Sequence, residues 1–273
     1  MSVNPNRIGT TLAALKQNKR KALVSYIVSG DPRPEVTLRA MHALVDAGTD
    51  IIELGIPFSD PMAEGPVIQR GHERSLAHQV SLRGTLATVR EFRRNDTSTP
   101  IVLMGYANPV IRMGFDTFAE SAAQAGVDGL LTVDLPPEEA RELNASLKEA
   151  NIENIFLIAP TTTNERVADI AKLGSGFIYY VSLKGVTGAG HLDVDSVREK
   201  LALVKEHTDL PLLVGFGIKD ATTAKQIGQV SDGVVVGSLY VDAMGKLASS
   251  DTEVVCDKLR ELVLPIRCGL DEL

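Results

Sequence analysis

One carboxylate lies in a predicted strand at a position where a charge is costly to bury. Within residues 50–55, side-chain alternation places Ile52 and Leu54 on one face and Glu53 on the other. The two aliphatic residues suit a face beneath helices, so Glu53 points into the space that the sheet encloses. Desolvation raises the pKa of such a group, which then exchanges protons near neutral pH. Glu53 is therefore a candidate acid or base, with a hydrogen-bonded structural carboxylate as the alternative.

The loop that follows this strand, residues 56–66, carries two more carboxylates, Asp60 and Glu64, among three prolines and one glycine. It is longer than most strand-to-helix loops, and loops of this kind often close over active sites. An ordinary surface turn is the alternative. Beside Glu53, Asp60 and Glu64 supply material for an acid–base pair.

Glycine-bearing segments follow the last three predicted strands, at residues 184–190, 215–217 and 237–238. Glycine allows backbone N–H groups to approach an anion without a Cβ in the way, and barrel enzymes often bind phosphate at these loops. We therefore expect a substrate that bears phosphate, although turns also favour glycine. Lys184 could form a Schiff base, but its place after the strand favours a solvated loop residue.

Several other chemistries find no support in the sequence. None of the five histidines is spaced with another histidine or a cysteine as metal ligands are, and we expect no metal site. The G-x-S-x-G pattern of serine hydrolases is also absent.

The net charge of −7 does not fit a protein that binds nucleic acid or a membrane surface. The densest basic stretch, residues 16–21, lies between a short predicted helix and a strand, and we interpret it as a solvated helix end.

Two features bear on localisation. The two cysteines, Cys256 and Cys268, are too few for a secreted disulfide framework, and the polar N-terminus has no apolar signal segment. We expect reduced thiols and a cytoplasmic chain.

Strand-like and helix-like segments alternate along all 273 residues. Eight such units predict a parallel sheet with helical crossovers, closed as a (β/α)8 TIM barrel with an extra N-terminal helix, in a single domain over residues 1–273. An open doubly wound sheet is the alternative, but the dinucleotide glycine pattern does not follow the first strand. The predicted strands are residues 23–28, 51–54, 101–106, 129–133, 155–158, 177–182, 212–215 and 233–236. The predicted helices are residues 7–17, 34–47, 67–77, 82–94, 115–125, 137–150, 164–173, 193–206, 220–227 and 239–265.

Residues 52–66 closely resemble the signature of the tryptophan synthase α chain family. The resemblance continues in order along nearly the whole chain. It includes residues 30–32, 104–109, 133–136, 179–182, 185–188, 215–218 and 236–238.

This resemblance implies a lyase of tryptophan biosynthesis that splits indole-3-glycerol phosphate into indole and glyceraldehyde 3-phosphate, a retro-aldol reaction without metal or Schiff base. It implies that Glu53 protonates the indole C3 and that Glu64 interacts with the indole N–H. The substrate-binding positions it implies are Tyr26 and Tyr106 at the indole, Tyr179 and Phe216 lining the site, Thr187 in a loop that closes over the substrate, and Gly188, Gly217, Gly237 and Ser238 around the phosphate.

The chain departs from the best-known family pattern at Glu64, where that pattern has Asp. The longer side chain retains the acid chemistry but carries its carboxylate farther from the backbone. The resemblance also implies an α2β2 complex in which the β subunit holds pyridoxal phosphate, while this chain needs no cofactor. Residues 57–60 and 108–109 resemble the surface that meets that partner.

Two rival functions stay open. One is another phosphate-binding barrel, such as a sugar-phosphate isomerase or epimerase, although those usually need a metal-binding histidine pair or a different acid pair. The other is a barrel that binds or regulates without catalysis, against which a barrel-facing Glu53 argues.

Overall fold

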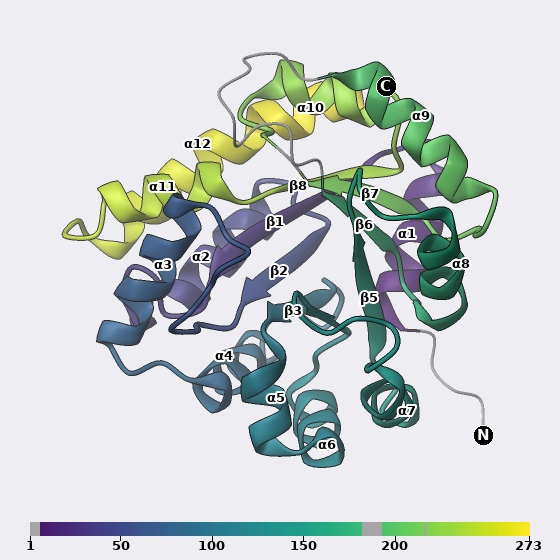
Figure 1. The fold of residues 1–273 in the computed structure, drawn as a ribbon. Helices are drawn as coiled ribbons and strands as arrows, with labels where there is room; N and C mark the ends of the chain where they lie inside the picture. The colour runs from purple at the N-terminus through teal and green to yellow at the C-terminus, as the bar shows by residue number, and fades with distance from the viewer. Residues whose placement is uncertain (1–5, 182–192, 216) are drawn as a thin grey trace.

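A computed structural model describes residues 6–181, 193–215 and 217–273 of the chain. Its strands lie in the centre and its helices surround them (Figure 1). The strands are β1 Ala22–Val28, β2 Ile51–Gly55, β3 Ile101–Gly105, β4 Gly129–Thr132, β5 Glu153–Ile158, β6 Ile178–Val181, β7 Leu212–Gly215 and β8 Gly233–Val236. The helices are α1 Arg7–Gln17, α2 Pro34–Asp46, α3 Pro66–Ala77, α4 Leu82–Phe92, α5 Ala107–Met113, α6 Phe115–Ala125, α7 Arg141–Glu149, α8 Asn164–Leu173, α9 Val194–Lys205, α10 Ala221–Gly228, α11 Ser238–Lys246 and α12 Thr252–Asp271.

The sheet closes on itself. Each strand pairs in parallel with the next. β1 completes the circle by pairing with β8, where Ala22 lies opposite Gly233 and Ser25 lies opposite Val236. The predicted TIM barrel with an extra N-terminal helix is therefore confirmed. A closed barrel gathers the carboxyl ends of all its strands at one mouth, where the loops that follow them meet.

Side-chain alternation divides the core into two layers. On β2, Ile52 and Leu54 pack outward against the helices, while Ile51 packs inside the barrel. Because Glu53 is two residues from Ile51, it shares the inward face, as predicted. Inside the barrel, α1 covers the amino-terminal end: its Ile8 and Leu12 join the inward cluster. Glu53 is therefore closed off from below, and only the mouth at the carboxyl ends of the strands gives access to it.

Most predicted elements are confirmed to within one or two residues, but the bounds of two predicted helices were wrong. The helix predicted at residues 137–150 begins only at Arg141, because Pro136 accepts hydrogen bonds from the N–H groups of Glu139 and Ala140 in a tight turn. The tail predicted as one helix over residues 239–265 is two helices, α11 and α12. The second continues through Pro265, since buried side chains on both sides of this residue pack against the barrel.

Helix α5 was not predicted. Its sequence contains Pro109, which normally argues against a helix, but Pro109 lies in the first turn, where a backbone N–H has no partner within the helix. Because Tyr106 precedes Ala107 as the N-cap, β3 ends at Gly105 rather than at the predicted residue 106.

A buried carboxylate ties three elements together at the amino-terminal side of the barrel. Asp128 accepts hydrogen bonds from Arg7 and Arg93, both at 2.7 Å, and from the backbone N–H of Ile101 at 2.8 Å. It thereby joins α1, the end of α4 and the start of β3. Since Asp128 is almost fully buried, its removal leaves buried donors without an acceptor.

We expect Asp128→Ala to lower the free energy of unfolding by about 3 kcal/mol, because removing one partner of a buried ion pair leaves the other charge without compensation. Asp195→Ala is a matched control: it breaks the exposed pair between Asp195 and Arg198 on α9 and should cost less than about 1 kcal/mol. Urea unfolding followed by circular dichroism measures both. Equal losses in the two variants would contradict the structural role of Asp128.

Candidate active site

Glu53 lies on the inward face of β2, near the mouth of the barrel, with only 1% of its surface exposed. Neither carboxylate oxygen has a hydrogen-bond partner among the described residues. Within that part of the chain, the alternative of a structural carboxylate bonded to a neighbouring strand is therefore not supported. A buried group without partners is costly in its charged form, and its retention points to chemistry.

Of the two loop carboxylates, Glu64 is the one placed with Glu53. Asp60 is exposed and accepts a hydrogen bond from Ser59, whereas Glu64 is partly buried and adds to the electrostatic field at Glu53. Of the two carboxylates predicted as material for an acid–base pair with Glu53, Glu64 is therefore the one that acts on Glu53 electrostatically.

Both carboxyl groups have strongly raised pKa values. Burial raises the pKa of Glu53 to about 8, and the nearby Glu64 carboxylate contributes in the same direction. Burial raises the pKa of Glu64 to about 7. Near neutral pH, Glu53 therefore retains its proton while Glu64 can ionise, so the pair offers a proton donor beside a carboxylate.

Three tyrosines predicted at the site surround this pair. Tyr26 on β1, Tyr179 on β6 and Tyr106 after β3 are buried, and burial raises the pKa of each hydroxyl. Glu64 raises the pKa of all three further, and Glu53 raises those of Tyr26 and Tyr179. The phenols thus stay protonated and present a wall that is flat and largely apolar but can donate hydrogen bonds.

The tyrosine hydroxyls lie over glycines of other strands. A Cβ built on Gly55 would lie 2.4 Å from the Tyr26 hydroxyl, and one on Gly215 would lie 2.2 Å from that of Tyr179. These two positions accept only glycine while the tyrosines keep this orientation.

The predicted anion site falls at the mouth above β7 and β8, where the glycines that follow these strands lie. Gly217 has a φ of +55°, and no atom of the described residues lies within 4 Å of the place where a Cβ would stand. Ser238 begins α11, and its N-cap, Gly237, has no side chain to satisfy the first N–H groups of that helix. By contrast, Asp220 caps α10 in a capping box. An uncapped helix start after β8 and an open glycine after the neighbouring strand β7 together suit a phosphate group.

Three predicted substrate-binding residues, Thr187, Gly188 and Phe216, lie outside the described residues. So does Lys184, the lysine considered as a Schiff-base residue. Their placement is therefore not part of the site as described.

The sequence interpretation missed His72. It lies on α3 with 2% of its surface exposed, its Nδ1 accepting a hydrogen bond from the Phe58 N–H at 3.0 Å. Its Nε2 is 3.4 Å from the Tyr26 hydroxyl. A signal was present: Ile68, Gly71, His72 and Ser75 have the spacing of one buried helix face, which marks His72 as an inward polar residue.

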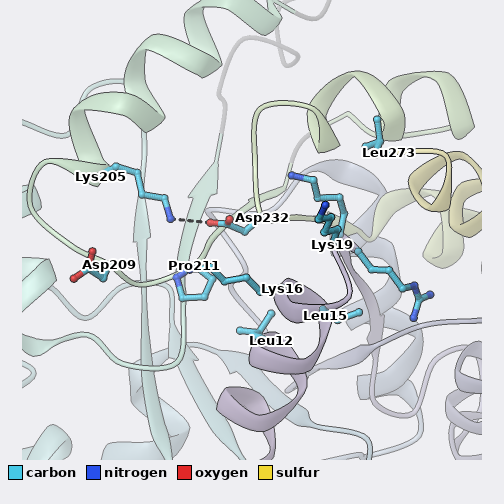
Figure 2. A pocket seen from close by; sticks show the side chains of 11 residues that line it. Leu12, Leu15, Lys16, Lys19, Lys205, Asp209, Pro211, Asp232 and Leu273 are labelled. Atoms are coloured by element: carbon cyan, nitrogen blue, oxygen red, sulfur yellow. Dashed lines mark hydrogen bonds and ion pairs between the residues drawn. The ribbon is translucent and has the colours of Figure 1, made fainter.

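A separate cavity of about 310 Å³ lies at the amino-terminal face of the barrel, remote from the carboxyl ends of the strands (Figure 2). The predicted basic stretch contributes to its wall, with Lys16, Lys19 and Arg20 exposed, as expected for a solvated helix end. Lys205 and Asp232 pair across it at 2.9 Å. This arrangement shares no residue with the site at Glu53.

Neither a membrane span nor a metal cluster is found in the described part of the chain. No helix there combines the length and the apolar character that crossing a membrane requires. No group of three or more histidine, cysteine, aspartate or glutamate side chains there is arranged to hold a metal ion.

Comparison with known proteins bears on these features together. A family profile described as "Tryptophan synthase alpha chain" matches residues 12–266. The tryptophan synthase alpha chain of Marinobacter nauticus is 54% identical, covering 98% of this chain and 99% of its own length. That of Thiobacillus denitrificans is also 54% identical, covering 97% of this chain and 96% of its own length.

Solved structures agree. The tryptophan synthase alpha subunit of Legionella pneumophila aligns with a TM-score of 0.92 at 43% identity, covering 99% of this chain and 100% of its own. A chain of tryptophan synthase from M. tuberculosis, in an aminoacrylate-bound form, aligns with a TM-score of 0.86 at 37% identity, covering 97% of this chain and 99% of its own. With a family profile over most of its length and relatives above half identity, the chain belongs to the tryptophan synthase alpha chain family.

Proposed function

We propose that Glu53 and Glu64 carry out the reaction of this family in this chain, the retro-aldol cleavage of indole-3-glycerol phosphate to indole and glyceraldehyde 3-phosphate. The observation that best supports this proposal is the carboxyl pair. Glu53 is buried on the inward face of β2 without a hydrogen-bond partner among the described residues, and Glu64 is close enough to raise its pKa. The sugar-phosphate isomerase alternative lacks its usual histidine pair, and a purely binding barrel has no use for an orphaned Glu53.

In the first step, protonated Glu53 donates its proton to C3 of the indole ring. The ring nitrogen then carries positive charge, and the Glu64 carboxylate opposite its N–H stabilises that charge. The pKa order supports this division, because Glu53 holds its proton more tightly than Glu64 does. The tyrosine wall of Tyr26, Tyr106 and Tyr179 holds the flat ring between the two groups.

In the second step, the Glu53 carboxylate removes the proton of the hydroxyl group next to the bond that breaks. The carbon–carbon bond to the ring cleaves, its electron pair returns to the indole system, and the hydroxyl carbon becomes the aldehyde. Glu53 ends as it began, protonated, so the two steps balance without any other acid or base. The same group serves first as acid and then as base.

We assign the substrate phosphate to the mouth above β7 and β8, with Gly217, Gly237 and Ser238 as the described part of the site. The uncapped start of α11 and the open space at Gly217 support this assignment. Thr187, Gly188 and Phe216 remain proposed members on the basis of the family pattern.

We propose a β subunit as the partner, in an α2β2 complex. The tryptophan synthase structures of M. tuberculosis support this proposal. Pyridoxal phosphate would reside in the β subunit, and the cleavage chemistry proposed here uses only side chains of this chain. The loop of residues 57–60 and the start of α5 are the proposed contact surface; Met62, in the adjoining part of the loop, is 82% exposed.

We also propose one folding unit over residues 1–273 and a place in the cytoplasm. The pairing of β1 with β8 supports the first, because neither half of the chain can close the barrel alone. Cys256 and Cys268, both free thiols, support the second.

We expect Glu53→Gln to abolish indole release from indole-3-glycerol phosphate, because an amide keeps the size of the side chain but cannot transfer the proton. Indole is assayed with the purified chain, alone and with a β subunit. Turnover near the wild-type rate would refute the role of Glu53, and no turnover by the wild-type chain would refute the function.

The same variant should be more stable than the wild type above neutral pH. With a folded-state pKa of about 8, Glu53 stays protonated in the native state while the unfolded chain ionises it, so the wild type loses stability as pH rises from about 4.5 to about 8. The glutamine variant has no ionisable group at this position and therefore no such loss. We expect a gain on the order of 4 kcal/mol at pH 8 that vanishes below about pH 4.5, measured by urea unfolding at both pH values.

The pH profile of kcat/KM should be bell-shaped. Activity falls below about 7 as Glu64 takes up a proton, and falls above about 8 as Glu53 loses its proton. Glu64→Gln should have lower activity throughout and lack the acid limb. A profile in which that variant keeps the acid limb would assign the limb to another group.

Gly217→Val should raise KM more than it lowers kcat, since a side chain there enters the proposed phosphate space, where the interaction is equally strong in ground and transition states. Gly114→Val is the control, because Gly114 also has a positive φ and a Cβ there would meet only Thr117 Oγ1, at 3.9 Å, while the residue lies between α5 and α6. Inorganic phosphate should compete with substrate in the wild type and compete more weakly in Gly217→Val. An unchanged KM with the fold intact would contradict the assignment.

A further inference from the structure

His72 occupies a position that the reaction steps above do not use. It is buried on α3, the helix that follows the Glu64 loop, and its ring lies between that loop and β1. The Phe58 N–H donates to Nδ1 at 3.0 Å, and the Tyr26 hydroxyl lies 3.4 Å from Nε2. One imidazole thus contacts both the loop that carries Glu64 and a wall of the substrate site.

The contact with Phe58 determines which nitrogen carries the proton. A backbone N–H can only donate, so Nδ1 must accept, and the neutral ring carries its proton on Nε2. Nε2 then donates to the Tyr26 hydroxyl oxygen. Burial lowers the pKa of His72 to about 4, which keeps the ring neutral and the acceptor available at physiological pH.

We propose that His72 is a positioning residue for Glu64, which it holds in place by accepting the Phe58 N–H at the start of the loop and by orienting Tyr26. This inference rests on the proposed function, because it gives His72 a role in the reaction assigned to Glu53 and Glu64.

The path from His72 to Glu64 consists of direct contacts. The Phe58 ring stacks on that of Tyr106, with centroids 4.9 Å apart and planes 22° apart. The Tyr106 hydroxyl accepts the N–H of Ala63 at 3.0 Å, one residue before Glu64. His72 therefore fixes the residue whose ring supports Tyr106, and Tyr106 fixes the backbone next to Glu64.

Between these anchors the loop has little else to hold it. Ser59 and Asp60 are exposed and Met62 is 82% exposed, so buried side chains do not fix the middle of the loop. After Glu64, Gln69 donates to the Glu64 carbonyl at 2.9 Å and restrains the other side. Without the acceptor at Nδ1, the Phe58 end would be free to shift, and small displacements of a catalytic group cost rate steeply.

Two substitutions separate hydrogen bonding from packing. The Oδ1 of asparagine lies as many bonds from Cα as the Nδ1 of histidine, so His72→Asn keeps an acceptor for the Phe58 N–H but leaves a smaller side chain. His72→Leu keeps nearly the volume of histidine and has no acceptor. His42→Leu is the matched control, because His42 lies on α2 and stacks on Phe92 at the end of α4, away from the site.

We expect His72→Leu to lower kcat by about 10- to 100-fold with KM changed by less than about 3-fold, since the misplaced group acts in the reaction rather than in phosphate binding. His72→Asn should retain kcat within about 5-fold of the wild type, and His42→Leu should match the wild type. If packing alone mattered, leucine would be tolerated better than asparagine. His72→Leu at full activity, or no better activity in His72→Asn than in His72→Leu, would overturn the proposal.

A measurement without substrate keeps the two proposals distinguishable. In the wild-type chain with ¹⁵N-labelled histidine, long-range proton–nitrogen correlation at neutral pH should show His72 neutral with its proton on Nε2. A proton on Nδ1, or a charged ring, would refute the positioning role even if indole is released. Absence of indole release by the wild-type chain would instead refute the proposed function.

Discussion

The active site depends on a carboxyl group that the barrel deprives of water. A charged carboxylate can be buried only if other groups replace its hydration, and the described surroundings of Glu53 provide none. Burial therefore raises the pKa of Glu53 to about 8, so the carboxyl group keeps its proton near neutral pH. An acid that weak donates its proton to a carbon atom poorly in water, but inside the barrel it is aimed at one atom and stays protonated at the pH at which the cell works.

The barrel produces this environment through its geometry. Alternation along β2 directs every second side chain inward, and the apolar residues beneath Glu53, such as Ile51, exclude water from below. Closure of the sheet by β1 and β8 removes the sheet edges through which water could reach the carboxyl group from the side. The loops at the mouth then need to supply only the groups that differ between barrel enzymes: a second carboxylate and an anion site.

Sequence reasoning reached the barrel and the inward direction of Glu53, because each follows from a local rule such as a period of two or a helix stop. The prediction failed where a tertiary contact overrode a local rule or added a partner that is distant in sequence. Pro265 was expected to end a helix, but buried neighbours on both sides hold α12 together. Pro109 hid α5, since a proline in a first turn resembles a proline in a loop. His72 was assigned no role, because its two partners, Phe58 and Tyr26, come from elements that only the fold brings together.

The choice of Glu rather than Asp at position 64 makes the anchoring of its loop more important. The extra methylene adds a rotatable bond between the backbone and the carboxylate, so the group can reach the same place from more backbone positions and lose precision in doing so. A chain that uses the longer acid must restrict the backbone instead. The hydrogen bond from Ala63 to Tyr106 and that from Gln69 to the Glu64 carbonyl restrict it on both sides of the residue. The Tyr106 ring is supported by the stacked Phe58 ring, and the Phe58 N–H is bound by the neutral imidazole of His72. The position of the Glu64 backbone therefore depends on His72.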